Sequence, residues 1–215
     1  MERMLSNGER LPDSSTFPEV GDALSRGYPP RARQGFTIFL TGLSGAGKST
    51  IANALRIKLL ERGGRAVTLL DGDLVRKQLS PELGFSREHR ELNIRRIALM
   101  AAEVTKSGGA VICAAIAPYA SIRREARHTI ESAGGFVLVF VDTPLELCER
   151  RDPKGHYAKA RAGLIEQFTG VSDVYEPPSD ADVIVRTAEI SPEQASERIL
   201  AHLESAGYLT PGDSA

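Results

Sequence analysis

The sequence contains no tryptophan and only two cysteines among its 215 residues. Cys113 lies in an apolar strand pattern and Cys148 in a helical one, which predicts two small buried side chains rather than a disulfide framework or a nucleophile site. The four histidines occur singly, without the spacing of metal ligands, and we interpret them as surface or lid residues. These histidines are His89, His128, His156 and His202.

Long apolar runs and an excess of one charge are also missing. The longest runs, residues 110–117 and 136–141, are far shorter than the roughly 20 residues of a membrane-spanning helix, and the N-terminal residues lack a secretory signal pattern. Lysine and arginine number 27 and aspartate and glutamate 28, so the formal net charge is −1. This balance argues against a chain-wide nucleic-acid-binding surface, although it leaves room for a local basic patch. We therefore expect a cytoplasmic protein that binds neither membranes nor nucleic acids.

The rest of the composition is typical of a folded chain, with 41% hydrophobic and 26% charged residues. Its length favours one domain with a lid or an appendage over two separate cores. Residues 1–34 are rich in turn formers and predict an N-terminal arm or linker, with room for a short helix over 18–26. We place the domain at residues 35–208 and a C-terminal tail at 209–215.

Strand and helix patterns alternate from residue 35 onward. Apolar, β-rich runs predict strands at residues 36–40, 66–70, 110–116, 136–141 and 183–185. Helical patterns predict helices at residues 49–61, from 73 onward, at 86–106, at 119–132, from 144 to about 151, and after 191. Continuous apolar strands separated by helices predict an α/β fold, in which a parallel sheet of about five strands carries helices on both faces.

Two helix starts and one long connection have signatures of their own. Thr143-Pro144 and Ser191-Pro192 each place a cap residue before a proline, with Glu or Gln three residues after the cap. Residues 152–178 are basic at first, contain glycine and are long for a connection in a compact domain, which predicts an active-site lid.

Residues 42–49, GLSGAGKS, match the phosphate-binding pattern GxxxxGK followed by Ser or Thr, between a predicted strand and a predicted helix. The glycines let backbone N–H groups approach phosphate oxygens, and the helix contributes its positive end. Lys48 would bridge the β- and γ-phosphates of ATP, and the Ser49 hydroxyl would ligate Mg²⁺. A ligand-free turn, the alternative, would leave both side chains without a role. We expect ATP to be held by Gly42, Leu43, Ser44, Gly45, Ala46, Gly47, Lys48, Ser49 and Thr50.

Two carboxylates, Asp71 and Asp73, come just after the second strand. In an open parallel sheet, ligands bind outside the carboxyl ends of the strands. Carboxylates there hold Mg²⁺ through water and accept a proton from an attacking hydroxyl, whereas a solvated turn is the alternative interpretation. We expect Asp71 first, and Asp73 second, to act as the base or the metal-water anchor, and the sequence does not separate these two roles.

A cluster of cationic side chains follows these carboxylates. Arg90 and Asn93 are three residues apart and share a helix face with Ile97, so they project from the core-facing side. At the carboxyl edge of the sheet they would bind an anionic substrate, although a solvated charge run stays open as the alternative. The cluster consists of Arg76, Arg90, Asn93, Arg95 and Arg96.

Four segments together resemble the adenylylsulfate kinase family: FLTGLSGAGKST, LDGDLVRKQLSPELGFSREHRELNIRR, AAIAPY and ERRDPKGHYAKARAGLIEQFTGVSDVYEPP. The resemblance covers residues 36–185 and implies a P-loop NTPase-type fold. It implies transfer of the γ-phosphoryl group of MgATP to the 3′-hydroxyl of adenosine 5′-phosphosulfate (APS), forming 3′-phosphoadenosine 5′-phosphosulfate (PAPS) and ADP in sulfate assimilation. It also implies a basic lid at residues 151–161 and substrate binding by Asp73, Arg76, Phe85, Arg90, Asn93, Ile116, Lys154 and Phe168.

The segment FPEV followed by PPRARQGFTIFL is similar to the stretch that precedes the kinase module of bifunctional ATP sulfurylase proteins. The resemblance therefore leaves open a fusion to, or association with, ATP sulfurylase, and it leaves open a homodimer. Two alternatives to catalysis of this reaction remain: another small-molecule P-loop kinase, and a non-catalytic nucleotide-sensing module of an ATP sulfurylase.

Two positions depart from the pattern of many family members. Leu74 stands where many have asparagine, and Ala117 stands where many have the serine linked to a phosphoenzyme form, although the fused modules also tend to have IAPY. Because alanine has no nucleophilic atom, we expect direct in-line transfer without a phosphoserine.

Overall fold

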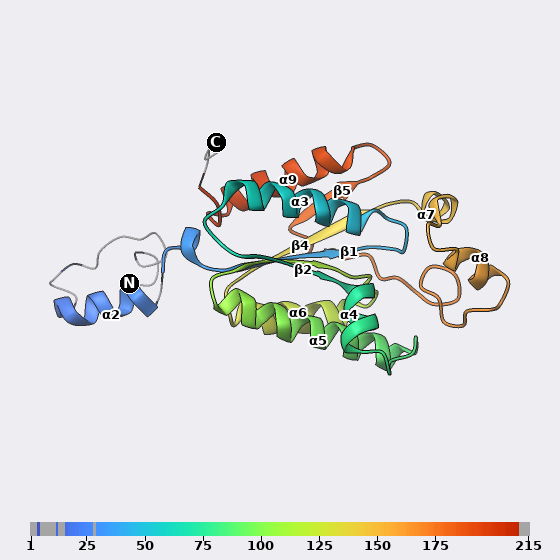
Figure 1. Ribbon diagram of the computed structural model, residues 1–215, viewed down its shortest axis with the longest axis horizontal. Helices are drawn as coiled ribbons and strands as arrows, with labels where there is room; N and C mark the ends of the chain where they lie inside the picture. Colours follow the sequence, from blue (N-terminus) through green and yellow to red (C-terminus); the bar gives the residue numbers. More distant parts are fainter. Residues whose placement is uncertain (1–3, 5–11, 13–15, 28, 211–215) are drawn as a thin grey trace.

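The computed structural model describes residues 4, 12, 16–27 and 29–210. Its centre is a five-stranded, all-parallel sheet in the order β2-β3-β1-β4-β5 (Figure 1). The strands are β1 (Phe36–Thr41), β2 (Val67–Asp71), β3 (Ala110–Ala114), β4 (Gly135–Asp142) and β5 (Val183–Arg186). The expected parallel α/β sheet is confirmed, with strand ends that differ by one or two residues from the predicted ones.

Helices cover both faces of this sheet (Figure 1). One face carries α3 (Lys48–Arg62) and α9 (Pro192–Ser205). The other face carries α4 (Gly72–Leu79), α5 (Arg87–Lys106) and α6 (Ala120–Glu131). The central strand β1 is buried along its whole length because alternate side chains enter both cores: Ile38 and Leu40 pack with α3 and α9, and Phe39 packs with α5 and α6.

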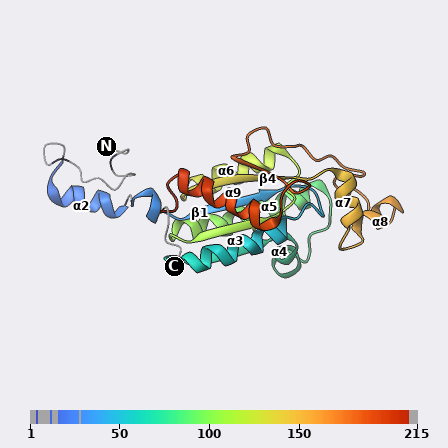
Figure 2. The same cartoon turned by 90° about the horizontal axis from the view of Figure 1, so that it is seen from above.

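The remaining described elements extend from the two ends of the sheet. Beyond the carboxyl ends of the strands lie α7 (Leu145–Arg151), which precedes the predicted lid, and α8 (His156–Arg161), which lies within it. At the opposite end lie α2 (Pro18–Gly27) and the 3-10 helix η1 (Arg31–Arg33), as Figures 1 and 2 show. Within the described residues, no helix is long and apolar enough to cross a membrane.

The N-terminal segment lies largely off the sheet, and the predicted short helix corresponds to α2. Arg65 holds the end of this segment to the domain by donating to the Gln34 carbonyl (2.7 Å). Most of the predicted arm before residue 16, and residues 211–215 of the predicted C-terminal tail, lie outside the described residues.

One of the two predicted helix caps is confirmed and one is wrong. Ser191 Oγ accepts from the Gln194 amide (3.3 Å), and the Gln194 side chain accepts from the Ser191 amide (2.9 Å), forming a capping box before α9. Thr143 caps nothing, because α7 begins at Leu145 and the Thr143 hydroxyl donates to the Ala46 carbonyl (3.0 Å). The Thr143 hydroxyl thus bonds to a residue far away in the sequence rather than to the start of α7.

The third strand also ends earlier than residue 116. After Ala114 the chain leaves the sheet, and Ala117 adopts a positive φ of 43°, an uncommon conformation for a residue other than glycine. The carbonyl of Ile116 accepts a hydrogen bond from Thr41 Oγ1 (2.6 Å). This turn brings Ile116 and Ala117 to the wall of a cavity.

Candidate active site

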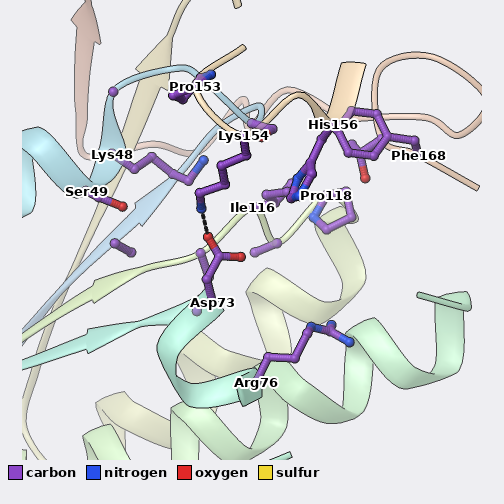
Figure 3. Close-up of a pocket in the computed structure, with 18 of the residues that line it drawn as sticks. Lys48, Ser49, Asp73, Arg76, Ile116, Pro118, Pro153, Lys154, His156 and Phe168 are labelled. Carbon is purple, nitrogen blue, oxygen red and sulfur yellow. Dashed lines mark hydrogen bonds and ion pairs between the residues drawn. The ribbon is translucent and has the colours of Figure 1, made fainter. Parts of the chain in front are cut away.

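A cavity of about 520 Å³ opens at the carboxyl ends of the strands. Its walls come from the loop between β1 and α3, the starts of α4 and α5, the chain that follows β3, and the region around α8 (Figure 3). These segments are far apart in the sequence, and the parallel topology brings them together because every strand ends at this edge.

The loop between β1 and α3 has backbone conformations that exclude most side chains. Gly42 has a φ of 148°, and a Cβ there would lie 2.5 Å from the Val141 carbonyl oxygen. Gly45 has a φ of 73°, and a Cβ there would lie 2.9 Å from the Cys148 carbonyl oxygen. Glycine is therefore required at both positions, and the loop wraps the N-terminus of α3, where free N–H groups bind anions.

Lys48 is the first residue of α3, and its side chain is buried at the cavity wall. Its ammonium group donates to the carbonyl oxygens of Gly42 (2.8 Å) and Leu43 (2.7 Å), so it reaches back across the loop. Burial lowers the pKa of Lys48 to about 8, although Asp73 and Asp71 favour its charged form. A positive charge is thus held, poorly solvated, where a phosphate chain would lie.

Asp71 and Asp73 have different environments. Asp71 is the N-cap of α4: its Oδ1 accepts from the amides of Asp73 (3.0 Å) and Leu74 (3.3 Å), and its Oδ2 accepts from Ser49 Oγ (2.7 Å). Asp73 lines the cavity and forms an ion pair with Lys154 across it (Figure 3). Asp71 therefore faces the phosphate loop through Ser49, whereas Asp73 faces the centre of the cavity.

The far wall of the cavity carries buried polar atoms without partners. Asn93 is 4% exposed, and its Oδ1 has no hydrogen-bond partner in the part of the chain that the structure describes. Arg90 Nε is also buried without a partner, and both residues line the cavity. Because an unsatisfied buried polar group is costly, these two atoms are candidates for contacts with a bound water or ligand.

The model of the family described as "Adenylylsulphate kinase" matches residues 34–186. The chain belongs to the adenylylsulfate kinase family. The family is one of ATP-dependent kinases, and the α/β fold with its phosphate-binding loop agrees with that membership.

Three similar proteins illustrate the family. An APS kinase from Mycobacterium tuberculosis, whose structure was solved in complex with AMPPNP and APS, is 42% identical to this chain (TM-score 0.76). The match covers 80% of this chain and 98% of the Mycobacterium chain. A hexameric APS kinase from Thiobacillus denitrificans is 45% identical to this chain (TM-score 0.76). That match covers 97% of this chain and 36% of the Thiobacillus chain. A sulfate adenylyltransferase from Phaeosphaeria nodorum is 50% identical over 210 residues, or 98% of this chain. The present chain spans 37% of the length of that relative.

The cavity gathers most of the positions predicted from the sequence. The predicted residues that line it are Ser44, Gly45, Gly47, Lys48, Ser49, Thr50, Asp73, Arg76, Phe85, Arg90, Asn93, Ile116, Lys154 and Phe168. Gly42, Leu43, Ala46 and Asp71 are not among the lining residues. The carbonyls of Gly42 and Leu43 accept from Lys48, the Asp71 carboxylate accepts from Ser49, and the Ala46 carbonyl accepts from Thr143.

The two remaining members of the cationic cluster do not reach the cavity. Arg95 pairs with Glu125 (2.7 Å) and Arg96 with Glu82 (2.6 Å), both on the outer surface. The alternative interpretation, a solvated charge run, therefore holds for these two residues and not for Arg90.

Several residues at the site were not predicted individually. Arg151 donates to Thr187 Oγ1 (3.0 Å), and both line the cavity beside the phosphate loop. Tyr119 and Asp173 contact one another (2.6 Å) and surround Arg90. Tyr119 and Asp173 fall inside the segments that resemble the family, but only the fold shows which side chain each one meets.

Proposed function

We propose that this chain catalyses transfer of the γ-phosphoryl group of ATP to the 3′-hydroxyl of APS, forming PAPS and ADP. The observation that carries the proposal is the single cavity that joins Lys48 and its glycine loop to the unpartnered polar atoms of Arg90 and Asn93. A triphosphate fits the cationic loop, and an anionic second substrate fits the opposite wall.

The loop residues divide the work of holding ATP. The loop residues that line the cavity, among them Gly45, Gly47 and Ser49, would bind the phosphates through backbone N–H groups, and Lys48 would contribute the charge that neutralises them. Ser49 Oγ and the Asp71 carboxylate supply the oxygen donors that Mg²⁺ prefers, Ser49 directly and Asp71 through water. Mg²⁺ bound there would neutralise negative charge on the phosphates.

We assign Asp73 the role of accepting the proton of the attacking hydroxyl. Asp73 lines the cavity, and among the described residues its carboxylate pairs with Lys154 alone, whereas the Asp71 carboxylate already accepts three hydrogen bonds. Ala117 lines the same cavity and has no nucleophilic atom, so transfer goes directly from ATP to the acceptor. Arg76, Phe85, Ile116 and Phe168 complete the proposed APS pocket.

An ADP-release assay with a panel of acceptors tests the function. We expect ADP formation with APS and not with shikimate, gluconate or nucleoside monophosphates. With γ-labelled ATP alone, we expect no acid-stable phosphoserine. Turnover with another acceptor would assign a different kinase activity, whereas folded protein without any turnover would favour a nucleotide-sensing module. Stoichiometric phosphate on a serine that is then transferred to APS to form PAPS would exclude direct transfer.

Replacement of Arg90 or Asn93 by alanine is expected to weaken the binding of APS more than the binding of ATP. A hydrogen bond to a charged group contributes roughly 1.5–3 kcal/mol, so we expect the KM for APS to rise about ten- to hundredfold. Steady-state kinetics with each substrate varied in turn measures both KM values. Arg95→Ala is the matched control on the outer face of α5, and it should leave both KM values unchanged. Equal weakening of both substrates by Arg90→Ala would indicate a structural role.

Residues 152–178 are proposed to act as a lid. Its Lys154 pairs with Asp73 across the cavity, and both side chains remain about half exposed or more, so this contact is weak. We expect ADP together with APS to slow hydrogen exchange in residues 152–170 relative to the free protein. Identical protection with and without the ligands, measured by mass spectrometry, would exclude closure of this segment.

The remaining partner and domain assignments belong to the same proposal. The family match over residues 34–186 supports a kinase domain at 35–208, preceded by a linker and followed by a short tail. The sulfate adenylyltransferase relative supports fusion to, or association with, ATP sulfurylase. Light scattering of the purified protein would distinguish a homodimer from a hexamer such as that of the Thiobacillus relative. A cytoplasmic location remains an expectation from the sequence.

A further inference from the structure

The guanidinium group of Arg90 is held by residues 169–173 of the proposed lid, which directly follow Phe168. One of its amino groups donates to Thr169 Oγ1 (2.7 Å), and the other forms an ion pair with the Asp173 carboxylate. Asp173 also accepts from the Tyr119 hydroxyl (2.6 Å), and the Arg90 guanidinium lies 5.6 Å from the centre of the Tyr119 ring. Three segments of the fold therefore meet at Arg90: α5, the connection between β3 and α6 with Tyr119, and the proposed lid.

The local backbone presents the two acceptors together. Thr169 and Asp173 form an isolated β-bridge, and the Gly170 amide donates to the Asp173 carbonyl (2.7 Å). Gly170 has a φ of 90°, so the tight turn between them uses a conformation that glycine adopts easily. The Asp173 carboxylate is fixed in turn, because its Oδ1 accepts from the Val174 amide (2.9 Å).

This arrangement leaves one side of Arg90 for the cavity. The side chain of Arg90 is only 10% exposed and that of Asp173 is 21% exposed, so their pairing is well shielded from water. Both terminal amino groups of Arg90 are engaged, and its buried Nε remains without a partner. The direction in which Nε points is therefore set by Asp173 and Thr169 rather than by Arg90 itself.

The charge on Asp173 persists in this environment. Partial burial would raise its pKa, but hydrogen bonds from the Tyr119 hydroxyl and the Val174 amide, together with Arg90, hold the pKa below its usual range. An ionised Asp173 also offsets the positive charge that Arg76, Arg87 and Arg90 place around this wall.

We propose that Asp173 is a positioning residue that orients Arg90 toward the anionic second substrate and couples this orientation to the lid. The inference rests on the proposed function, in which Arg90 contacts APS. In this proposal the carboxylate does not touch the substrate; it holds the guanidinium of Arg90, a residue that lines the cavity, in one orientation. The contribution of Asp173 is therefore expressed through Arg90.

Kinetics of Asp173→Asn tests this role. Asparagine keeps the size of the side chain and can still accept from Tyr119, but it removes the charge that holds Arg90. We expect the KM for APS to rise about tenfold, with kcat and the KM for ATP within twofold of the wild type. Asp180→Asn, an exposed acidic residue further along the same segment, is the control and should change none of these values.

A double variant separates positioning from simple loss of lid structure. In an Arg90→Ala background, Asp173→Asn is expected to change the KM for APS by less than twofold, because its target is already absent. Tyr119→Phe removes one donor to the carboxylate and should raise the KM for APS by a smaller factor. This variant also carries the test if Asp173→Asn does not fold, as judged by circular dichroism.

Three results would overturn the inference: an unchanged KM for APS in Asp173→Asn, equal effects on APS and ATP, or full additivity with Arg90→Ala. Each of these leaves wild-type turnover of APS intact, so the proposed function would stand. Wild-type protein without APS-dependent turnover would overturn both proposals.

Discussion

Lys48→Met should lower kcat for phosphoryl transfer by roughly 10³-fold, or about 4 kcal/mol of transition-state stabilisation. The Lys48 ammonium is buried beside the phosphate loop, where poor solvation strengthens its attraction for developing negative charge. Methionine keeps an unbranched side chain in the same space and removes only the charge and its hydrogen bonds. Steady-state ADP release measures the effect, and turnover close to wild type would remove this lysine from the mechanism.

Stability measurements separate this loss from unfolding. Folding lowers the pKa of Lys48 from its ordinary value of 10.5 to about 8, because burial disfavours the charged form. Between these two values the unfolded chain binds more protons than the folded chain, so this group makes wild-type stability rise with pH in that window. Lys48→Met is therefore expected to leave the Tm at pH 7 unchanged or higher. Lys58→Met, in the same helix and paired only with Glu197 at the surface, is the control for both measurements.

Asp73→Asn should lower kcat by roughly 10²–10⁴-fold, the usual range for loss of a general base. Asparagine cannot accept the proton of the attacking hydroxyl, although it fits the same position in the cavity. The ion pair between Asp73 and Lys154 is largely exposed, so the loss of this pair should cost little stability. We expect the KM for ATP to remain within about threefold of the wild type, because the Asp73 carboxylate pairs with Lys154, whereas Ser49 pairs with Asp71.

Asp71→Asn is the matched comparison, two residues away. Its carboxylate caps α4 and accepts from Ser49. Asparagine caps helices about as well as aspartate, so we expect weaker binding of MgATP and a change of less than about 0.5 kcal/mol in the free energy of unfolding. Kinetics with ATP varied at fixed Mg²⁺ distinguishes the two residues. If Asp71→Asn lost more kcat than Asp73→Asn at saturating substrates, the two assignments would be reversed.

Features with local causes were predictable from the sequence. The apolar runs of β1, β3 and β4 marked buried parallel strands, since a strand covered on both faces needs little polar alternation. The glycines around Lys48 marked the phosphate loop, and Ser191 with Gln194 marked the start of α9. In each case the residues responsible lie within a few positions of one another, and their geometry follows from backbone conformation and hydrogen bonding.

Other features required partners that lie far away along the chain. Thr143 has the local signature of a cap, yet its hydroxyl bonds to Ala46, 97 residues away. Asp71 and Asp73 are equivalent acidic residues in the sequence, and only their contacts with Ser49 and Lys154 support our proposal that one is a metal anchor and the other a base. These outcomes depend on which segments the parallel sheet brings to one edge.

The sequence by itself determined that this chain forms a parallel α/β fold with a phosphate-binding loop, because strand burial, glycine placement and capping are local. Only the tertiary structure decided that Arg96 turns to Glu82, and that Asp173, 83 residues from Arg90, holds the guanidinium of Arg90. A side chain adopts the direction in which its charge and hydrogen bonds are satisfied, and those partners exist only once the strands, the helices and the lid have assembled.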